Sequence, residues 1–419
     1  MSVNPLRHSC LILLALLVTP LLPLARACAQ AIGDRPVLKV DGSPDYATQD
    51  RYDFPDDQTG LRAGPFEILP SAAQTLAYDS NVFAAPGPGK QSALSITQAL
   101  LHVTNESGGT LSFDADAYGR VRRFTDVSNQ DTTEYGGSAA LDWNSSAQDE
   151  LTGRILAQRR FEARTDIETP NIPQVSLYDE RQGNLTYAHT YNRLRLNYSV
   201  TGDQLEYQDP GQKYRDRSYY QGGLQAAYEL PVGLSIVGTG YHSEDDYRFV
   251  THQLAGGQTT GAQLGAAMTL PEVVEFQLTA GYFRRNFAQH LGEIAGLSIT
   301  GNMVLYLTRL TTLRVDLTRQ DQPTRIPGAY GKIRTDGLLE LGHAYSRSFN
   351  LYARARVVVD DFSTVQRTDT TYLGEVGAFC ELSRWWVLAV EYDFSERKSS
   401  VQNANFHQHL MSVSLIGRL

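Results

Sequence analysis

From Phe66 to Leu419 the chain is a succession of short segments in which apolar and polar residues alternate. In one of them, Leu111, Phe113, Ala115, Ala117 and Val121 alternate with Ser112, Asp114, Asp116, Arg120 and Arg122. A period of two places one set of side chains on each face of a strand. Strands of about 10 residues with one apolar face and one charged face are typical of a membrane-spanning barrel. The sequence therefore predicts an all-β chain that forms a transmembrane antiparallel β-barrel.

The same alternation reaches the C-terminus. Trp386–Arg397 places Glu391 and Asp393 between apolar neighbours, and the last segment keeps the period up to Leu419. Barrels of the outer membrane usually end in an aromatic residue, and Leu419 departs from that pattern. The departure weakens the signal for barrel assembly without changing the predicted fold.

Short and long connections alternate between about 18 predicted strands. The short ones are Asn105–Gly109, Asn144–Asp149, His189–Arg193, Glu229–Gly233, Pro271–Val273, Thr308–Leu310, Ser346–Ser348 and Ser383–Arg384. The long ones centre on Pro86–Lys90, Asp126–Gln130, Arg164–Val175, Gln208–Asp216, Ser243–Gly257, Arg285–Ala295, Gln320–Lys332, Asp360–Thr370 and Glu396–Asn405. Short turns of outer-membrane barrels are periplasmic, so both termini are expected in the periplasm. A secreted β-helix or a soluble β-sandwich does not explain this alternation.

The first residues are typical of a secretory signal peptide, which we place at residues 1–29. Arg7 supplies a positive start, and Cys10–Leu24 is an apolar stretch without charge. Ala27–Ala29 or Ala29–Ala31 provides the small residues of a cleavage site. A lipoprotein signal ending at Cys28 and an uncleaved membrane anchor are the alternatives. The apolar stretch is shorter than a spanning helix requires and contains two prolines, which disfavours the anchor.

Residues 30–65 lack periodicity and are rich in aspartate, proline and glycine. This composition predicts a flexible acidic periplasmic segment ahead of a barrel over residues 66–419. A plug or a partner-docking peptide is the functional alternative. Cys10 and Cys28 fall in or at the end of the signal, so Cys380 has no evident partner and a disulfide framework is excluded. The net charge of −9 argues against nucleic acid as a partner.

Three short stretches resemble a known family: Leu69-Pro70, Tyr78–Phe83 and Arg159–Arg164. Together with a barrel that runs to the last residue, they are similar to the second group of putative β-barrel porins of Gram-negative bacteria. The resemblance covers residues 66–419. It implies a bacterial outer-membrane location, a link to export of surface polysaccharide, and no catalytic residues.

The alternation predicts a set of charged side chains that point into the barrel. They are Asp114, Asp116, Arg120, Arg122, Glu134, Asp142, Arg154, Arg160, Arg195, Arg314, Asp316, Arg354, Arg356, Glu391 and Asp393. Isolated charges in a low-dielectric space are costly, so these groups must pair or meet water. One interpretation is a structural network of salt bridges across the lumen. The other is a pore whose arginines guide an anionic solute such as an acidic glycan.

An Arg-Arg-Phe pattern recurs where strands should reach the outer surface. Because adjacent strand residues face opposite sides, Arg123, Arg159 and Arg284 are expected to face the membrane rim. Arginine binds phosphate well, so contacts with lipopolysaccharide are one interpretation. Ordinary interfacial arginines beside an aromatic girdle are the other.

The sequence does not favour catalysis. It lacks a Gly-x-Ser-x-Gly elbow, and His407-x-His409 has no evident third ligand for a metal. We therefore expect no enzyme activity, no cofactor and no metal site.

The expected function is a channel for hydrophilic solutes that assists export of a cell-surface polysaccharide, a task implied by the resemblance. The alternatives are a general or substrate-selective diffusion porin and a closed structural or adhesive barrel. Expected partners are outer-membrane lipids, lipopolysaccharide, a polysaccharide chain and periplasmic export proteins.

Overall fold

The computed structural model describes residues 60–105, 110–169, 173–248, 254–288, 291–346 and 348–419. The expected signal peptide at residues 1–29 lies outside the described residues. So does the expected acidic segment, except for its last six residues, 60–65.

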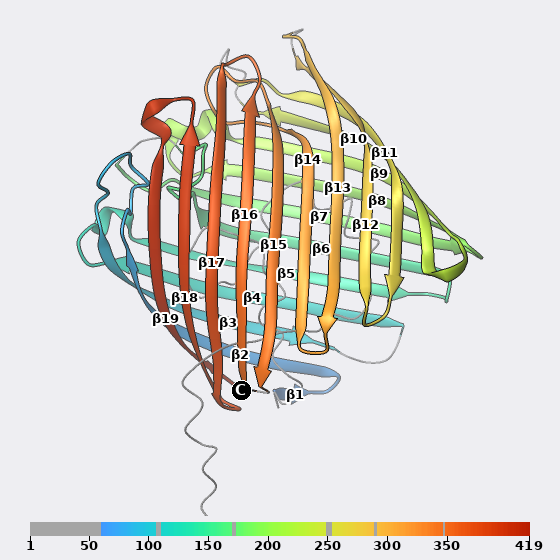
Figure 1. Ribbon diagram of the computed structural model, residues 1–419, viewed down its shortest axis with the longest axis horizontal. Helices are drawn as coiled ribbons and strands as arrows, with labels where there is room; N and C mark the ends of the chain where they lie inside the picture. Colours follow the sequence, from blue (N-terminus) through green and yellow to red (C-terminus); the bar gives the residue numbers. More distant parts are fainter. Residues whose placement is uncertain (1–59, 106–109, 170–172, 249–253, 289–290, 347) are drawn as a thin grey trace, which may run out of the picture.

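The described residues form one antiparallel sheet that closes on itself (Figure 1). Its strands are β1 (Leu61–Ala63), β2 (Phe66–Asp79), β3 (Ser92–Thr104), β4 (Leu111–Phe124), β5 (Thr132–Asn144), β6 (Asp149–Phe161), β7 (Leu177–Tyr191), β8 (Leu194–Tyr207), β9 (Arg217–Glu229), β10 (Leu234–Tyr247), β11 (Gly257–Leu270), β12 (Val274–Phe287), β13 (Glu293–Thr308), β14 (Thr311–Gln322), β15 (Lys332–Ser346), β16 (Phe349–Phe362), β17 (Arg367–Ser383), β18 (Trp386–Ser399) and β19 (Phe406–Arg418). Among the described residues, short 3₁₀ helices lie between strands: η2 (Ser128–Gln130), η3 (Pro210–Arg215), η4 (Pro231–Gly233) and η6 (Gln402–Ala404).

Closure comes from the pairing of the last strand with the second. Leu410 lies opposite Asp79, and Arg418 lies opposite Ser71. The 18 strands β2 to β19 thus form the closed barrel, which confirms the predicted fold class. In Figure 1 the near strands cross the direction of the far strands, as the tilt of strands in a barrel requires. The short strand β1 pairs with Phe66–Ile68 of β2, beyond the reach of β19.

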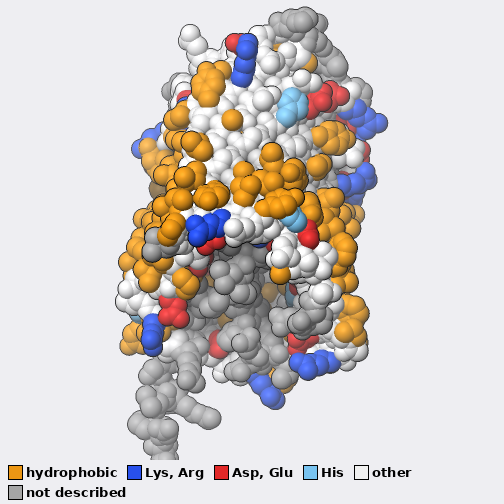
Figure 2. Space-filling view, turned by 90° about the vertical axis from the view of Figure 1, so that its right-hand side faces the viewer, with side chains coloured by type: hydrophobic (Ala, Val, Ile, Leu, Met, Phe, Trp, Pro, Cys, Tyr) orange, Lys and Arg blue, Asp and Glu red, His pale blue; other side chains and the backbone are white. Residues whose placement is uncertain are grey.

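The two faces of the strands differ as the alternation predicts. Large apolar side chains such as Leu76, Ile155 and Leu264 are 65 to 67% exposed on the outer face. Figure 2 shows hydrophobic side chains spread over one side of the barrel surface. The side chains between them in sequence are mostly buried and polar, and they face the interior. No helix in the described part of the chain is long and apolar enough to cross a membrane.

Several strands are longer than the sequence indicated. Ser243, Arg285 and Asp360 were expected at the edges of long loops, but they lie within β10, β12 and β16. These strands continue because their polar residues still alternate. Asp245 and Tyr247 of β10, for example, are buried on the inner face while their neighbours are exposed.

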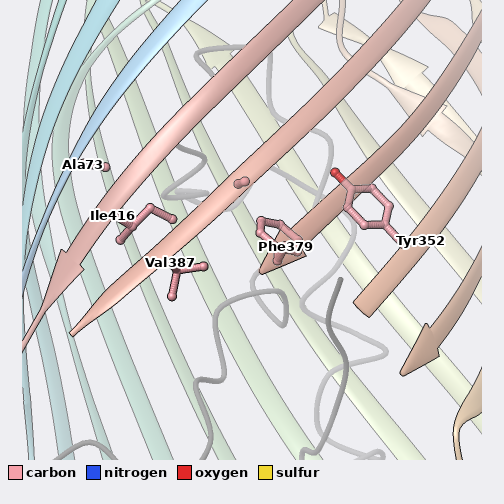
Figure 3. Packing of buried hydrophobic residues seen from close by; sticks show 6 residues of the cluster. Ala73, Tyr352, Phe379, Val387 and Ile416 are labelled. Atoms are coloured by element: carbon pink, nitrogen blue, oxygen red, sulfur yellow. The ribbon is translucent and has the colours of Figure 1, made fainter. Parts of the chain in front are cut away.

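An apolar cluster covers part of the inner wall at the short-turn end of β16 to β19 (Figure 3). It contains Ala73, Tyr352, Phe379, Val387, Ala389 and Ile416. The hydroxyl of Tyr352 donates to Glu375 Oε1 at 2.8 Å and also contacts Glu391. The charged lining of this wall therefore begins immediately beyond the cluster.

Candidate functional site

The strand register places every charged residue that the sequence assigned to the lumen on the inner face of the barrel. These residues come from β4 (Asp114, Asp116, Arg120, Arg122), β5 (Glu134, Asp142), β6 (Arg154, Arg160), β8 (Arg195), β14 (Arg314, Asp316), β16 (Arg354, Arg356) and β18 (Glu391, Asp393). The wall of the lumen therefore carries both signs of charge.

Many of these side chains form pairs with charged residues of the adjacent strand or of the strand after it. Arg195 Nη2 lies 2.6 Å from Glu150 Oε2, and Arg356 Nε donates to Asp336 Oδ1 at 2.8 Å. On β16, the guanidinium of Arg354 contacts Glu340 and Glu375. Such pairs satisfy buried charges that would otherwise be costly.

Other lumen residues contact polar or aromatic side chains of their own strand or of a nearby strand. Asp116 lies 2.8 Å from His102 Nδ1, and Arg314 Nε donates to Asp316 at 2.8 Å. Arg120 Nε donates to Gln98 Oε1 at 3.0 Å, with Glu134 at 3.4 Å. Arg122 lies over the ring of Phe161, 4.1 Å from its centroid.

Two long connections fold into the lumen, which the sequence did not predict. They are the described parts of the β6–β7 loop (residues 162–169 and 173–176) and the β14–β15 loop (residues 323–331). Ile167 of the first loop and Ala329 of the second pack in one buried cluster with Phe362, an inward side chain of β16. The two loops therefore meet inside the barrel rather than above it.

Arg325 of the β14–β15 loop joins the two loops through three carboxylates. Its guanidinium lies 2.8 Å from Glu162, 3.2 Å from Asp166 and 2.7 Å from Glu168. It also donates to the hydroxyl of Tyr207 at 2.7 Å. We call Arg325 with these three carboxylates the loop latch.

The barrel wall and the β8–β9 loop hold the same acidic segment. Arg215 of η3 binds both carboxylate oxygens of Glu162, at 2.8 and 2.7 Å, and donates to the carbonyl of Glu168 at 2.9 Å. Lys332, at the start of β15, lies 3.0 Å from Glu168 Oε1. The guanidinium of Arg397 donates to the carbonyl of Thr165.

The electrostatics of the latch favour the charged forms of both partners. Burial disfavours the carboxylate of Glu168, but Lys332 and Arg325 outweigh burial and hold the pKa of Glu168 well below its usual range. Burial likewise disfavours the charged form of Arg325. Tyr207, Glu162 and Glu168 outweigh it and hold the pKa of Arg325 well above its usual range.

Two cavities border the start of the β6–β7 loop. The smaller, about 80 Å³, is lined by Arg122, Arg354, Arg356, Asp79 and Asp393 among others. The larger, about 230 Å³, is lined by side chains from two opposite sides of the barrel, β4 to β9 and β15 to β18, and from both inward loops. Its described lining includes eight cationic residues (Arg120, Arg160, Arg217, Arg325, Lys332, Arg334, Arg356, Arg397) and six acidic ones (Glu162, Asp166, Glu168, Glu180, Asp203, Asp360). A solute in this cavity would meet arginines from opposite sides of the barrel.

The outward arginines of the recurrent pattern each lie beside a carboxylate. Arg159 binds both oxygens of Asp179, at 2.7 and 3.0 Å. Arg284 donates to Glu293 at 2.8 Å, and Arg123 lies 3.8 Å from Asp131. The side chains of Arg284 and Arg123 are 62% and 54% exposed, against 31% for Arg159. Arg284 and Arg123 are thus more accessible to an external phosphate.

Sequence reasoning missed the residues of the loop latch and its anchors. Glu168, Arg215 and Arg325 were assigned to loops, and Glu162 was noted only as part of the Arg159–Arg164 stretch. Nothing in the local sequence indicates that these loops turn inward. Their partners lie up to 164 residues away along the chain, as for Glu168 and Lys332. In the described part of the chain, no group of three or more His, Cys, Asp or Glu side chains could hold a metal ion.

Several solved structures have a similar overall fold. One is OpdK of Pseudomonas aeruginosa, in a crystal structure with vanillate, with a TM-score of 0.46, 12% identity, and coverage of 84% of this chain and 99% of that one. Another is OccAB3 of Acinetobacter baumannii, with a TM-score of 0.44, 11% identity, and coverage of 84% and 99%. A third is OccK2 of P. aeruginosa in complex with glucuronate, with a TM-score of 0.45, 12% identity, and coverage of 84% and 98%.

Among curated protein sequences, none gives a significant match to this chain. A family model does match, over residues 54–419, and its description is "Putative beta-barrel porin 2". The match extends over the whole barrel and begins a few residues before it.

Proposed function

This chain belongs to the "Putative beta-barrel porin 2" family, and we propose that its lumen conducts hydrophilic solutes with a preference for acidic ones. The protein is a β-barrel porin of the bacterial outer membrane rather than an enzyme. The proposed preference for acidic solutes follows from the chemistry of the lumen.

The single observation behind the proposal is the larger cavity between the two inward loops and both walls. Arginines from opposite sides line it, together with carboxylates that limit how tightly an anion is held. Conduction requires binding that is favourable enough for entry and weak enough for release. A wall of mixed sign with a small excess of cations meets both requirements.

The specific task we favour is export of an acidic cell-surface polysaccharide, with periplasmic export proteins as partners. Substrate-selective diffusion of small acidic solutes accounts for the same lumen and is the alternative. A closed structural barrel is a second alternative, which the docked loops favour, because they occupy the space between the walls.

Efflux from proteoliposomes tests the channel proposal. Vesicles containing the refolded full chain would be loaded with hexagalacturonate or with maltohexaose, and release would be timed. Faster release of the acidic sugar than of the neutral one supports the proposal. Equal release indicates a general porin, and no release of either indicates a closed barrel.

A deletion in the source bacterium separates export from uptake. Loss of surface polysaccharide, with normal growth on small organic acids, supports export. Normal surface polysaccharide with impaired growth on an acidic solute supports selective diffusion instead.

We also propose that Arg123 and Arg284 bind phosphate groups of lipopolysaccharide at the rim of the barrel, with Arg159 contributing less. The support is their exposure on the outer face and the suitability of guanidinium groups for phosphate. The carboxylates beside them reduce the net charge that the rim presents.

A further inference from the structure

The acidic segment of the β6–β7 loop is held much as an acidic ligand would be held. Within residues 162–168 it presents three carboxylates, Glu162, Asp166 and Glu168, to cations from other parts of the barrel. Its backbone carbonyls at Thr165 and Glu168 also accept hydrogen bonds from arginines. Carboxylates interspersed with neutral oxygen acceptors are the groups that a chain of uronic-acid sugars presents.

The cations that bind the segment are not part of it. Arg215 belongs to the β8–β9 loop, Arg325 to the β14–β15 loop, and Lys332 and Arg397 to the wall. They would remain as an array of cations inside the lumen if the segment moved away. The adjoining cavity extends that array with Arg120, Arg160, Arg217 and Arg356.

One oxygen atom of the barrel wall at the larger cavity, Oδ1 of Asp203, is buried and has no hydrogen-bond partner within the described residues. Asp203 is 3% exposed. Buried polar groups are nearly always hydrogen-bonded, so a sugar hydroxyl that takes the place of the loop could donate to this atom.

We infer that residues 162–168 occupy the binding track of an acidic glycan and that the glycan passes by exchanging its carboxylates for those of the loop. This inference rests on the proposed function and names the solute class of the same lumen. Glu162, Asp166 and Glu168 act as an internal substitute for the solute.

Exchange explains selectivity in physical terms. Removing one partner of a buried ion pair is strongly destabilising because the remaining charge is left uncompensated. An incoming carboxylate avoids that cost, since each cation exchanges one anionic partner for another. A neutral glycan leaves Arg325 and Arg215 without their carboxylate partners and cannot displace the loop in this way.

The experiment measures binding of hexagalacturonate and maltohexaose to the full chain in detergent by isothermal titration. The test variant combines Glu162→Gln, Asp166→Asn and Glu168→Gln, which removes the internal carboxylates and leaves the cations in place. Its matched control is Glu229→Gln, which removes an exposed carboxylate at the short-turn end of β9, away from the inward loops. The heat-dependent mobility of the barrel on SDS gels verifies folding, and Glu168→Gln alone replaces the triple variant if that variant does not fold.

The inference predicts that Kd for hexagalacturonate falls by about tenfold or more in the test variant, equivalent to about 1.4 kcal/mol. Maltohexaose binding should be unchanged in the test variant, and the Glu229→Gln control should bind both sugars as the wild type does. An unchanged or higher Kd for hexagalacturonate would overturn the inference, as would an equal gain for maltohexaose, which would mean that only space was created. If the wild type conducts while this test fails, the proposed function stands without exchange. If no variant conducts or binds either sugar, the proposed function itself fails.

Discussion

Arg325 Nε donates a hydrogen bond to Glu168 Oε2 at 2.7 Å, although the two residues lie 157 positions apart in sequence. The bond joins the β14–β15 loop to the β6–β7 loop. Glu168 is buried and Arg325 is half-buried between opposite sides of the barrel. The contact is one of several that hold the described parts of the β6–β7 and β14–β15 loops together. The behaviour of the channel should therefore depend on this pair.

Replacing Arg325 with glutamine should release the loops. The change leaves Glu162 and Glu168 without one of their cations, and breaking a buried pair costs about 3–5 kcal/mol. The population of undocked loops should then rise by roughly a hundredfold or more. Single-channel recording should show larger or longer openings than in the wild type.

Arg309→Gln is the matched control for that variant. Arg309 lies exposed in the short turn between β13 and β14, at the opposite end of the barrel. Its currents should equal those of the wild type. Identical currents in Arg325→Gln and Arg309→Gln would mean that the latch does not control the lumen.

The latch should be insensitive to pH across the neutral range. Glu168 has a lowered pKa in the folded protein, so its contribution to docking is complete above the ordinary carboxyl pKa of about 4.3. Docking weakens only as the pH falls through the lower folded value. The raised pKa of Arg325 prevents a corresponding loss on the alkaline side.

Channel current should therefore stay constant from about pH 5 to pH 8 and increase only in more acidic solution. In Glu168→Gln this particular acid-dependent step should be absent, and the current at neutral pH should already be higher. A current that changes steadily between pH 5 and pH 8 in the wild type, and equally in Glu168→Gln, would assign the pH response to other groups.

The two faces of β11 should respond differently to a charge. Leu264 is 67% exposed on the outer face near the middle of the strand. Leu264→Arg should lower the free energy of unfolding by roughly 2–4 kcal/mol, because a charge then faces the hydrocarbon layer. Urea titration of the protein in lipid vesicles measures the change.

Gln263→Arg, at the adjacent residue, is the control for the lumen face. Gln263 donates to Ser298 and accepts from Thr279 inside the barrel. The substitution should cost less than Leu264→Arg because polar groups surround the new side chain. Equal costs at the two positions would contradict the assignment of faces.

The contribution of each rim arginine to lipopolysaccharide binding should increase with the exposed fraction of its side chain. Arg284→Gln and Arg123→Gln should each reduce the amount of lipopolysaccharide that co-purifies, and Arg159→Gln should reduce it less because Asp179 already engages that guanidinium at two points. Quantifying bound phosphate per protein checks this order. Unchanged lipopolysaccharide in the triple Gln variant would exclude specific binding.

The alternation of the sequence was sufficient to predict the faces of the strands, because the facing of a side chain depends only on its position within a strand. Arg120 and Glu134 were both expected inside, and both lie there, on neighbouring strands. Strand ends were less predictable. Asp245 was assigned to a loop because its neighbours are polar, yet it lies on the inner face of β10 and pairs with Arg285.

The inward loops could not be predicted from local sequence. Their conformation depends on contacts such as Arg325 with Glu162 and Lys332 with Glu168, whose partners are far apart in the chain. A charged loop of the same composition could equally extend into solvent. Only the closed barrel brings these residues into one space.

Single-channel conductance of the refolded full chain in a planar bilayer tests the central claim most directly, with hexagalacturonate and maltohexaose added in turn. We predict stable unitary currents that hexagalacturonate blocks more strongly than maltohexaose does. Equal block by the two sugars would contradict a preference for acidic solutes. The absence of any current, in the wild type and in Arg325→Gln alike, would contradict a channel.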